Sequence, residues 1–544
     1  MGDDFHRLAL RGFLVFSILL SPVGLVSAQP TEAPVAPASP FELNGAALQQ
    51  AFTSAMSQYQ AKSYLEAASV FARIVDSADS TDALVQESNY LLGVSLFELG
   101  LHQSALVRFE PIIEASTAHP KYRQLLPYLL KIARSASAEP NVLEKIAQYD
   151  PSTYPPDFAD ELHFLVGRYH FSQDSLDEAL RRFGRVSRKN VDLHVGARYL
   201  EGVIHVAQSG LDADPATADA DRLKAAAKSF KDILRTQRDG KSSDTVDKVA
   251  AMANLALGRL FFSTRQYGVA VRYYDLIDDK NPDWLQAIFE VSWVYFQLRQ
   301  YPRALGNLHT LTSPFFTDQY FPESRVLQAL ILFYNCRYDD ALGVVKEFVQ
   351  DYYPLLKELR AQLNQFPDPN AFYLWLARLS RASDSKFSER FKRIFNAALA
   401  DRKLRRKFAF ITVLNKELSS IKALESEASN KKVFLASLKG ELMSYRSLVV
   451  GEAGSLAQAR LTRVLKELKQ HLAGALKIKG ETLKAQRNAL SSDVRREQAA
   501  AAAATFELVV DEEHVEWPFK GEYWKDELGS YIYDITSKCQ KASN

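Results

Sequence analysis

The chain has 544 residues, of which 47% are hydrophobic and 24% are charged, a balance typical of folded globular proteins. A single hydrophobic core rarely grows beyond about 250 to 300 residues, so we expect two or more units. Lysine and arginine number 67 and aspartate and glutamate number 65. Such an even balance excludes the strong positive field that holds a polyanion, and no nucleic-acid partner is expected.

The N-terminal residues 1–28 predict a secretory signal peptide. Arg7 and Arg11 precede an apolar run over residues 12–20, and small residues lead up to a cleavage site after Ala28. We therefore expect a periplasmic mature protein that contacts the membrane only indirectly. An uncleaved anchor is the alternative, because the apolar stretch approaches the length of a membrane span. Residues 29–43, rich in proline and alanine, predict an extended linker.

A recurring pattern of small and large residues organises residues 44–354. A glycine or other small residue is followed twelve positions later by an alanine and four positions after that by a large apolar residue. Each set falls on one face of a helix, so the pattern predicts about eight helix pairs in which the small residue allows close approach. One copy carries an acidic insertion, Leu211–Asp221. The clearest copies are defined by Gly93, Ala105, Phe109, Gly167, Ala179, Phe183, Gly258, Ala270 and Tyr274.

This pattern, for example Leu92-Gly93 followed by Ala105 and Phe109, resembles the tetratricopeptide repeat (TPR) family. The tryptophan usual near the start of the first helix and the closing proline are missing from most copies. The resemblance implies an α-solenoid whose concave groove binds a peptide or protein. Together with the segments described below, the expected fold class is all-α, with a TPR-like α-solenoid followed by a long helical coiled-coil hairpin and a small β-containing C-terminal segment.

Residues 355–504 predict long helices with coiled-coil spacing. Apolar residues recur at intervals of three and four, as in Leu461, Leu465, Leu468, Leu472 and Ala475. Gly451–Ser455 interrupts the pattern, which predicts an antiparallel hairpin that turns there. An extended rod that forms a homodimer through the coiled coil is the alternative. The basic run of residues 402–407 is expected to be a solvated helix face.

Residues 505–544 have a different texture, with alternating β-formers at 506–510 and 531–535 that predict a small hairpin. The tryptophan-rich stretch between them is expected to dock on the protein's own helices, with clamping of a partner as the alternative. Cys336 and Cys539 are expected to be two separate thiols, although they could pair in an oxidising compartment.

Aromatic residues crowd the later repeats and the C-terminal segment, and exposed aromatic patches are typical of contact surfaces. For the aromatic residues in the repeats, inter-repeat packing is the preferred interpretation and partner docking the alternative. The candidate partner-binding residues are Trp284, Trp293, Phe315, Phe316, Tyr320, Trp517, Phe519, Tyr523 and Trp524.

Motifs for phosphate loops, zinc proteases, nucleophile elbows and paired cysteines are missing from the sequence, so we expect no enzyme and no cofactor. No metal is expected, because the acidic run before His514 has no second histidine or cysteine cluster. The domain order is also similar to that of exported TPR and coiled-coil proteins of delta-proteobacteria, such as those of the myxobacterial adventurous gliding machinery. The expected function is a non-catalytic periplasmic scaffold of a cell-envelope complex, connected by that resemblance with motility. A peptidoglycan enzyme or its direct activator is the alternative.

Overall fold

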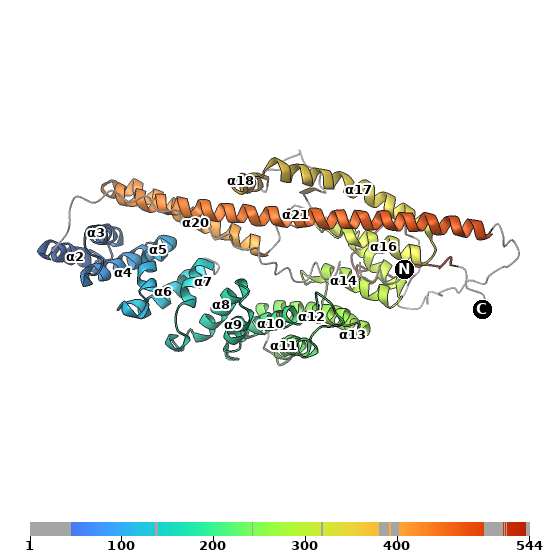
Figure 1. Ribbon diagram of the computed structural model, residues 1–544, viewed down its shortest axis with the longest axis horizontal. Coiled ribbons are helices and arrows are strands. Elements are labelled where there is room, and N and C mark those ends of the chain that lie inside the picture. The colour runs from blue at the N-terminus through green and yellow to red at the C-terminus, as the bar shows by residue number, and fades with distance from the viewer. Residues whose placement is uncertain are drawn as a thin grey trace. The chain divides into compact units, whose positions relative to one another are not determined.

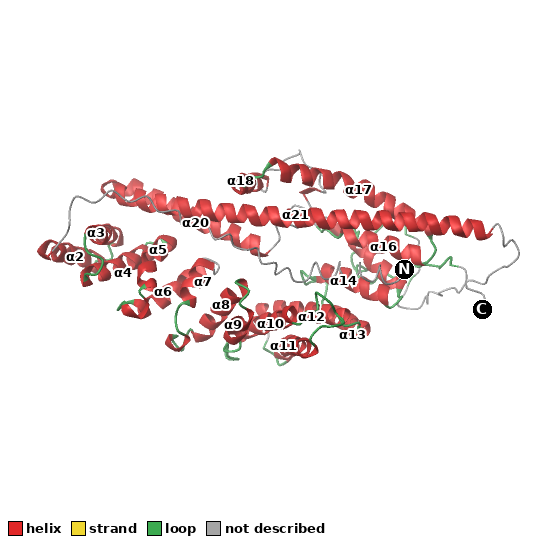
Figure 2. Cartoon of the chain, in the orientation of Figure 1, coloured by secondary structure: helices red, strands yellow, loops and turns green. Residues whose placement is uncertain are grey.

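The computed structural model describes residues 45–135, 140–241, 243–316, 319–379, 391–392, 402–493, 515, 517 and 519–539. Regular structure in these residues is helical throughout, without a β-strand (Figure 2). The all-α class is therefore confirmed for this part of the chain, and the strand predicted at 531–535 is wrong. The predicted signal peptide, linker and strand at 506–510 lie outside the described residues.

Eight helix pairs follow one another along the described part of the chain, in agreement with the predicted repeat count (Figure 1). They are α2 (Gly45–Gln60) with α3 (Tyr64–Ser77), α4 (Ala83–Glu98) with α5 (His102–Glu114), α6 (Tyr122–Ser135) with α7 (Pro140–Ala147), α8 (Ala159–Ser172) with α9 (Leu176–Phe183), α10 (Val191–Gln208) with α11 (Ala220–Arg238), α12 (Asp244–Ser263) with α13 (Tyr267–Tyr274), α14 (Trp284–Gln297) with α15 (Tyr301–Leu311), and α16 (Pro322–Tyr334) with α17 (Tyr338–Gln365).

Three further α-helices and four short 3-10 turns complete the described elements. α17 continues through Pro354, where the repeats were predicted to end, because an internal proline removes only one helical hydrogen bond and packing on both sides maintains the helix. The remaining elements are α18 (Pro369–Leu379), α20 (Arg402–Glu427), α21 (Lys432–Asp493), η1 (Ser116–Ala118), η2 (Pro151–Thr153), η3 (Pro314–Phe316) and η4 (Ser429–Lys431).

Six of the eight pairs share one turn, in which a single residue adopts the left-handed conformation. This residue stands seven positions after the small residue of its repeat and five before the alanine, as Gly100 does between Gly93 and Ala105. The backbone N–H of the next residue closes the preceding helix, as in the 2.9 Å bond from Leu101 N to the Leu96 carbonyl. The six left-handed residues are Lys62, Gly100, Asp174, Arg265, Arg299 and Cys336.

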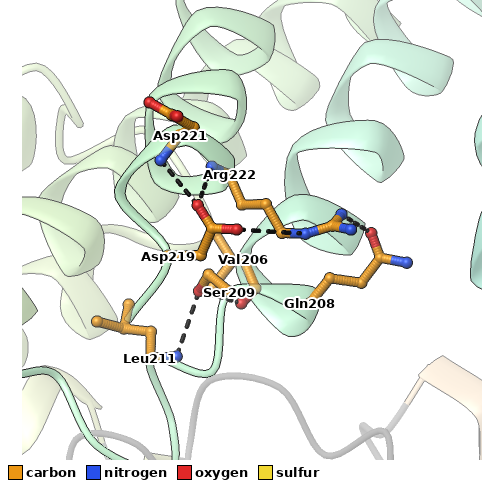
Figure 3. A network of polar contacts seen from close by, with 7 residues as sticks. All are labelled: Val206, Gln208, Ser209, Leu211, Asp219, Asp221 and Arg222. Atoms are coloured by element: carbon orange, nitrogen blue, oxygen red, sulfur yellow. Dashed lines mark hydrogen bonds and ion pairs between the residues drawn. The ribbon is translucent and has the colours of Figure 1, made fainter. Parts of the chain in front are cut away.

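The pair α10/α11 instead contains the predicted insertion, and polar contacts hold both of its ends (Figure 3). Asp219 caps α11 by accepting hydrogen bonds from the backbone N–H groups of Asp221 and Arg222 at 2.9 and 3.1 Å. At the other end, the Ser209 hydroxyl donates to the Val206 carbonyl at 2.6 Å. The insertion therefore leaves and rejoins the pair at defined points.

Close contact between a glycine and an aromatic ring holds the helices of a pair together. A Cβ atom placed on Gly167 would lie 2.6 Å from the Phe183 ring, and one on Gly258 would lie 2.7 Å from the Tyr274 ring. Both rings are buried, as is the alanine four residues before each of them. The same contact joins Gly93 to Phe109 and Gly202 to Phe230.

Replacement of Gly167 by alanine should therefore destabilise the protein. The overlap with the buried ring costs on the order of 1 to 3 kcal/mol and outweighs the roughly 1 kcal/mol that alanine contributes to helix stability. Gly440→Ala is the matched control, because a Cβ atom on this helical glycine would have no neighbour within 4 Å. Thermal unfolding followed by circular dichroism should show a lower midpoint for Gly167→Ala and an unchanged or higher one for Gly440→Ala. Equal midpoints for the two variants would contradict the role of the contact.

The chain divides into two compact units. The described residues of the first unit are 45–135, 140–197 and 402–455, and those of the second unit are 198–241, 243–316, 319–379, 391–392, 456–493, 515, 517 and 519–539. Each unit thus combines several repeats with a segment of the later helices.

In the first unit, α20 and the beginning of α21 lie side by side and run antiparallel (Figure 1). Lys407 pairs with Glu452 at 2.9 Å, and Glu425 pairs with Lys439 at 2.9 Å. The turn falls at residues 428–431, so the turn predicted at Gly451–Ser455 is wrong. α21 continues through those residues because Ala453 and Gly454 are buried there, and this packing offsets the weak helix propensity of glycine.

Glu417 attaches α20 to the second helix pair. Its buried carboxylate accepts hydrogen bonds from the backbone N–H groups of Gln103 and Ser104, both at 2.9 Å, and from the Ser104 hydroxyl at 2.8 Å. These donors stand at the start of α5, where unpaired N–H groups and the helix dipole favour a negative charge. Arg108 of α5 adds an ion pair with Glu441 of α21 at 2.7 Å.

In the second unit, the apolar seam of α21 packs on the chain's own repeats. Leu468, Leu472, Ala475 and Ile478 belong to one buried cluster with residues of helices α12 to α17. The spacing of Leu468, Leu472 and Ala475 predicted a coiled-coil partner, but the same periodicity is found in any helix that buries one narrow face.

A buried carboxyl group stands at the start of α16 in the same unit. Burial, followed by the nearby Glu467 and Glu290 carboxylates, raises the pKa of Glu323 to about 8. The folded protein thus keeps a proton at this site that the unfolded chain loses near pH 4.5.

The contribution of Glu323 to stability should therefore be greatest below about pH 4.5 and fall as the pH rises to about 8, by at most about 1.4 kcal/mol per pH unit. Glu323→Gln removes the ionisable group, so its urea midpoint should decline less than that of the wild type between pH 5 and pH 8. Glu347→Gln, at an exposed position on α17, serves as the control and should follow the wild type. A parallel decline in Glu323→Gln and wild type would exclude this effect.

Candidate protein-docking surface on the C-terminal strap

Residues 519–539, which we name the strap, dock on helices α14 to α16 within the second unit. Two backbone N–H groups of the strap donate hydrogen bonds to α15 and to the end of α16. The Tyr533 N–H donates to the Pro302 carbonyl at 3.0 Å, and the Lys538 N–H donates to the Asn335 carbonyl at 2.9 Å. These donors bind a carbonyl of α15 and the carbonyl of the residue that follows α16. Residues 531–535 have no regular structure, so the predicted hairpin does not form there. The expectation that the tryptophan-rich stretch docks on the protein's own helices agrees with the contacts of Phe519 and Tyr523 with His309 of α15.

Two glycines allow the strap to approach closely. A Cβ atom on Gly306 of α15 would overlap the Tyr531 carbonyl group. Gly529 has a φ of +91°, which other residues rarely adopt, and its Cβ position lies 2.7 Å from the Trp284 ring. The Gly529 N–H also donates to the Thr310 hydroxyl at 2.9 Å. The fit of the strap on α15 therefore depends on residues without side chains.

His309 of α15 is the centre of an aromatic cluster that binds the strap. Its ring stacks on Tyr523 at a centroid distance of 4.5 Å and meets the edges of Phe519 and Tyr531 at 4.5 and 5.1 Å. Burial, with a smaller contribution from the Arg325 guanidinium, lowers the pKa of His309. A neutral imidazole is the form that packs among aromatic rings at low cost.

A disulfide between Cys336 and Cys539 closes the far end of the strap, with the two Cα atoms 5.0 Å apart. The expectation of two separate thiols is therefore wrong. The two cysteines are 203 positions apart in the chain, and only docking of the strap brings them together. Cys336 occupies the left-handed position of the α16/α17 turn, which presents its side chain at the end of the pair.

Three large aromatic side chains near the beginning of the strap are exposed to solvent, although the Phe519 ring also packs against His309. Trp517 is 57% exposed, Phe519 54% and Trp524 39%, and we name these three residues the aromatic patch. The Trp517 and Trp524 rings meet at 5.1 Å, and the Trp517 Nε1–H donates to the Glu522 carboxylate. Clusters of exposed tryptophan are typical of surfaces that bind other proteins.

The candidate residues in the repeats divide between packing and exposure. Trp293 is buried, Trp284 packs against Phe316 and the strap, and burial raises the pKa of Tyr320. Phe315, by contrast, is 52% exposed. The interpretation as inter-repeat packing thus describes Trp293 well, whereas Trp284 forms the floor beneath the strap.

Sequence reasoning missed Gly306, His309 and the cysteine pair. A lone helical glycine, an isolated histidine and two distant cysteines carry no local pattern, so nothing in the sequence connected them. Among the described residues, no group of histidine, cysteine and carboxylate side chains is arranged to hold a metal ion. The described helices also include none that is both long and apolar enough to cross a bilayer.

The described architecture defines a class of helical-repeat proteins built from antiparallel helix pairs. Among solved structures, the chain is similar to a tetratricopeptide repeat protein from Parabacteroides merdae ATCC 43184, with 13% identity over 56% of this chain and 93% of that chain and a TM-score of 0.24. It is also similar to the APC/C hetero-tetramer Cut9-Hcn1, with 16% identity over 77% of this chain and 84% of that chain and a TM-score of 0.18.

Both TM-scores are too low for these superpositions to carry an argument, so the class rests on the helix pairs themselves. No family model matches the sequence, and no curated protein matches it either.

Release of the strap should require loss of both the disulfide and the glycine fit. Gly306→Ala places a methyl group against the Tyr531 carbonyl, and a reductant removes the covalent closure. Under reducing conditions, limited proteolysis should cleave the strap of Gly306→Ala at least about tenfold faster than that of the wild type, because cleavage follows the population of the open form.

Gly343→Ala on α17 is the matched control, since its Cβ position has no neighbour within 4 Å. It should be cleaved at the wild-type rate. Equal cleavage of Gly306→Ala and Gly343→Ala would show that the close approach at α15 does not hold the strap.

Proposed function

We propose that this protein is a non-catalytic scaffold of a cell-envelope complex that binds other envelope proteins. The aromatic patch carries the proposal, because Trp517, Phe519 and Trp524 stay exposed on a segment that a disulfide and close backbone contacts hold in place. An ordered aromatic surface loses little conformational entropy on binding, which favours tight association.

A periplasmic location forms part of the proposal. The signal-peptide pattern of residues 1–28 supports export, and the Cys336–Cys539 disulfide supports an oxidising compartment, where such bonds persist. The domain order is similar to that of exported repeat proteins of the myxobacterial gliding machinery. A motility complex is therefore the first assembly in which to seek the partner.

Capture experiments with the mature protein and a periplasmic extract test the proposal. Wild-type protein should retain a defined companion that the double variant Trp517→Ala/Trp524→Ala loses, because truncation of a tryptophan hot spot costs on the order of 2 kcal/mol or more. A photo-crosslinking residue in place of Phe519 should form an adduct with the same companion in cells.

The double variant Val433→Ala/Leu448→Ala is the control. These side chains of α21 are also apolar and exposed, but they lie outside the aromatic patch. Retention of the companion by both double variants, or its loss from both, would rule out the aromatic patch as the docking surface.

A further inference from the structure

The second half of α21 has an exposed side whose residue pattern repeats after seven positions. Starting at Ala473 and again at Gly480, a small residue is followed three positions later by leucine and four positions later by lysine. All six residues are exposed, and they share one side of the helix because seven residues make about two turns. We name them the outer face: Ala473, Leu476, Lys477, Gly480, Leu483 and Lys484.

The outer face lies opposite the side of α21 that packs on the repeats. Leu468, Leu472 and Ala475 belong to the buried cluster of the second unit. Leu476 and Leu483, by contrast, are 54% and 47% exposed. This half of α21 therefore carries two rows of apolar residues, and the described part of the chain covers only one of them.

Small residues form the line between the leucines and the lysines of the outer face. Ala473 has a side chain of one carbon, and a Cβ atom placed on Gly480 would have no neighbour within 4 Å. These two positions leave space at intervals of two helical turns. In paired helices, side chains of one helix fit between residues of the other that are spaced by three and four positions, as they are here.

The same stretch of α21 is basic. Residues 466–487 contain six basic and two acidic side chains, a formal charge of +4 with histidine neutral. One of the two carboxylates, Glu467, lies on the covered side near Tyr320 and Glu323. All six basic residues are exposed, so the outer face and its ends favour a partner with negative charge. They are Lys466, Lys469, Lys477, Lys479, Lys484 and Arg487.

We propose that the outer face docks one helix of a partner protein in which leucine or isoleucine residues form a narrow row flanked by glutamate or aspartate. The apolar row packs against Leu476 and Leu483 over the small residues, and the flanking carboxylates lie over the lysines. This inference rests on the proposed scaffold function and adds to it a second surface and the chemistry of its partner.

A second copy of this chain fits the outer face less well than an acidic helix does. In a helix pair, the residues beside one apolar row meet those beside the other. Two outer faces would therefore bring Lys477 and Lys484 of each chain close to basic residues of the other. Like charges in these positions oppose association.

A lipid bilayer also fits the outer face less well. Helices that lie in the membrane interface present a broad apolar side with large side chains. The outer face has only two large apolar residues, and the positions between them and the lysines are an alanine and a glycine. Space at small residues suits the side chains of another helix better than a flat layer of lipid.

Binding of labelled peptides of three heptads to the full mature chain, measured by fluorescence anisotropy, tests the proposal. Three repeats of Glu-Ile-Ala-Ala-Leu-Glu-Lys supply an acidic helix with an apolar row. This peptide should bind at least about tenfold more tightly than three repeats of Glu-Ser-Ala-Ala-Ser-Glu-Lys, which lack the apolar row, and than three repeats of Lys-Ile-Ala-Ala-Leu-Lys-Glu, which reverse the charge. Equal affinities for the two acidic peptides would overturn the proposal, as would tighter binding of the basic one.

A leucine variant locates the binding within the molecule. Leu476→Ala/Leu483→Ala should weaken the acidic peptide at least about tenfold, because it removes the apolar contacts of the outer face. Val433→Ala/Leu448→Ala is the matched control, since these exposed side chains lie elsewhere on α21, and it should bind like the wild type. Wild-type affinity in Leu476→Ala/Leu483→Ala would refute the site.

A charge variant tests the electrostatic part. Lys469→Glu/Lys484→Glu should weaken the acidic peptide at least about tenfold and reduce the dependence of its affinity on salt. Lys228→Glu/Lys432→Glu reverses two exposed helical lysines elsewhere and should leave the affinity unchanged. Equal affinities for the two charge variants would show that the lysines of this face do not select the partner.

The other two occupants are tested with the leucine variant. Wild type and Leu476→Ala/Leu483→Ala should behave alike in sedimentation with vesicles of phosphatidylethanolamine and phosphatidylglycerol, and also in measurements of mass in solution. Vesicle binding that the variant abolishes would assign the outer face to a lipid surface and overturn the proposal. A dimer that the variant dissociates would assign the face to a second copy, with the same consequence.

The aromatic patch separates this test from that of the scaffold function. Trp517→Ala/Trp524→Ala should bind the acidic peptide like the wild type, because neither tryptophan belongs to the outer face. If the acidic peptide fails to bind while the aromatic patch still captures its companion, the helix site is refuted and the scaffold function stands. Peptide binding without any captured companion would have the opposite meaning.

Discussion

The contact between a glycine on one helix and an aromatic ring on the next is the constraint on which the repeats depend. At Gly93, Gly167, Gly202 and Gly258, the missing Cβ leaves the space that the ring of the second helix fills. The two helices of a pair therefore pack close together. One pair is too small to bury the apolar faces of its helices, so it needs neighbouring pairs. The shared left-handed turn then determines where the second helix begins.

The later helices and the strap use the surfaces that these pairs leave available. In the first unit Glu417 binds the N-terminus of α5, and in the second unit the seam of α21 and the strap cover parts of the repeats. Segments whose patterns suggested a partner helix or a hairpin thus bury their apolar residues against other parts of the same chain. The aromatic patch proposed for a partner lies at the beginning of this docked strap and beside it.

Sequence patterns predicted the structure correctly where the contacting residues lie in the same helix pair. The offset from Gly93 to Ala105 and Phe109 lies within a single helix pair, so the sequence predicts both helices and their contact. The same logic failed at Gly451–Ser455, where glycine suggested a turn but buried packing of Ala453 keeps the helix continuous. The spacing of Leu468 and Leu472 predicts correctly that these residues are buried, but it does not indicate which surface they pack against.

The sequence by itself determined the all-helical repeat architecture and its pairwise register, because these depend on spacings of fewer than about twenty residues, well within one helix pair. Only the tertiary structure decided where the strap lies, that Cys336 meets Cys539, and that His309, Gly306 and Trp284 form its seat. Those contacts join residues roughly 200 or more positions apart, and a distance of that size leaves no periodic trace in the sequence. Their pairing follows from packing of whole elements, which no local propensity encodes.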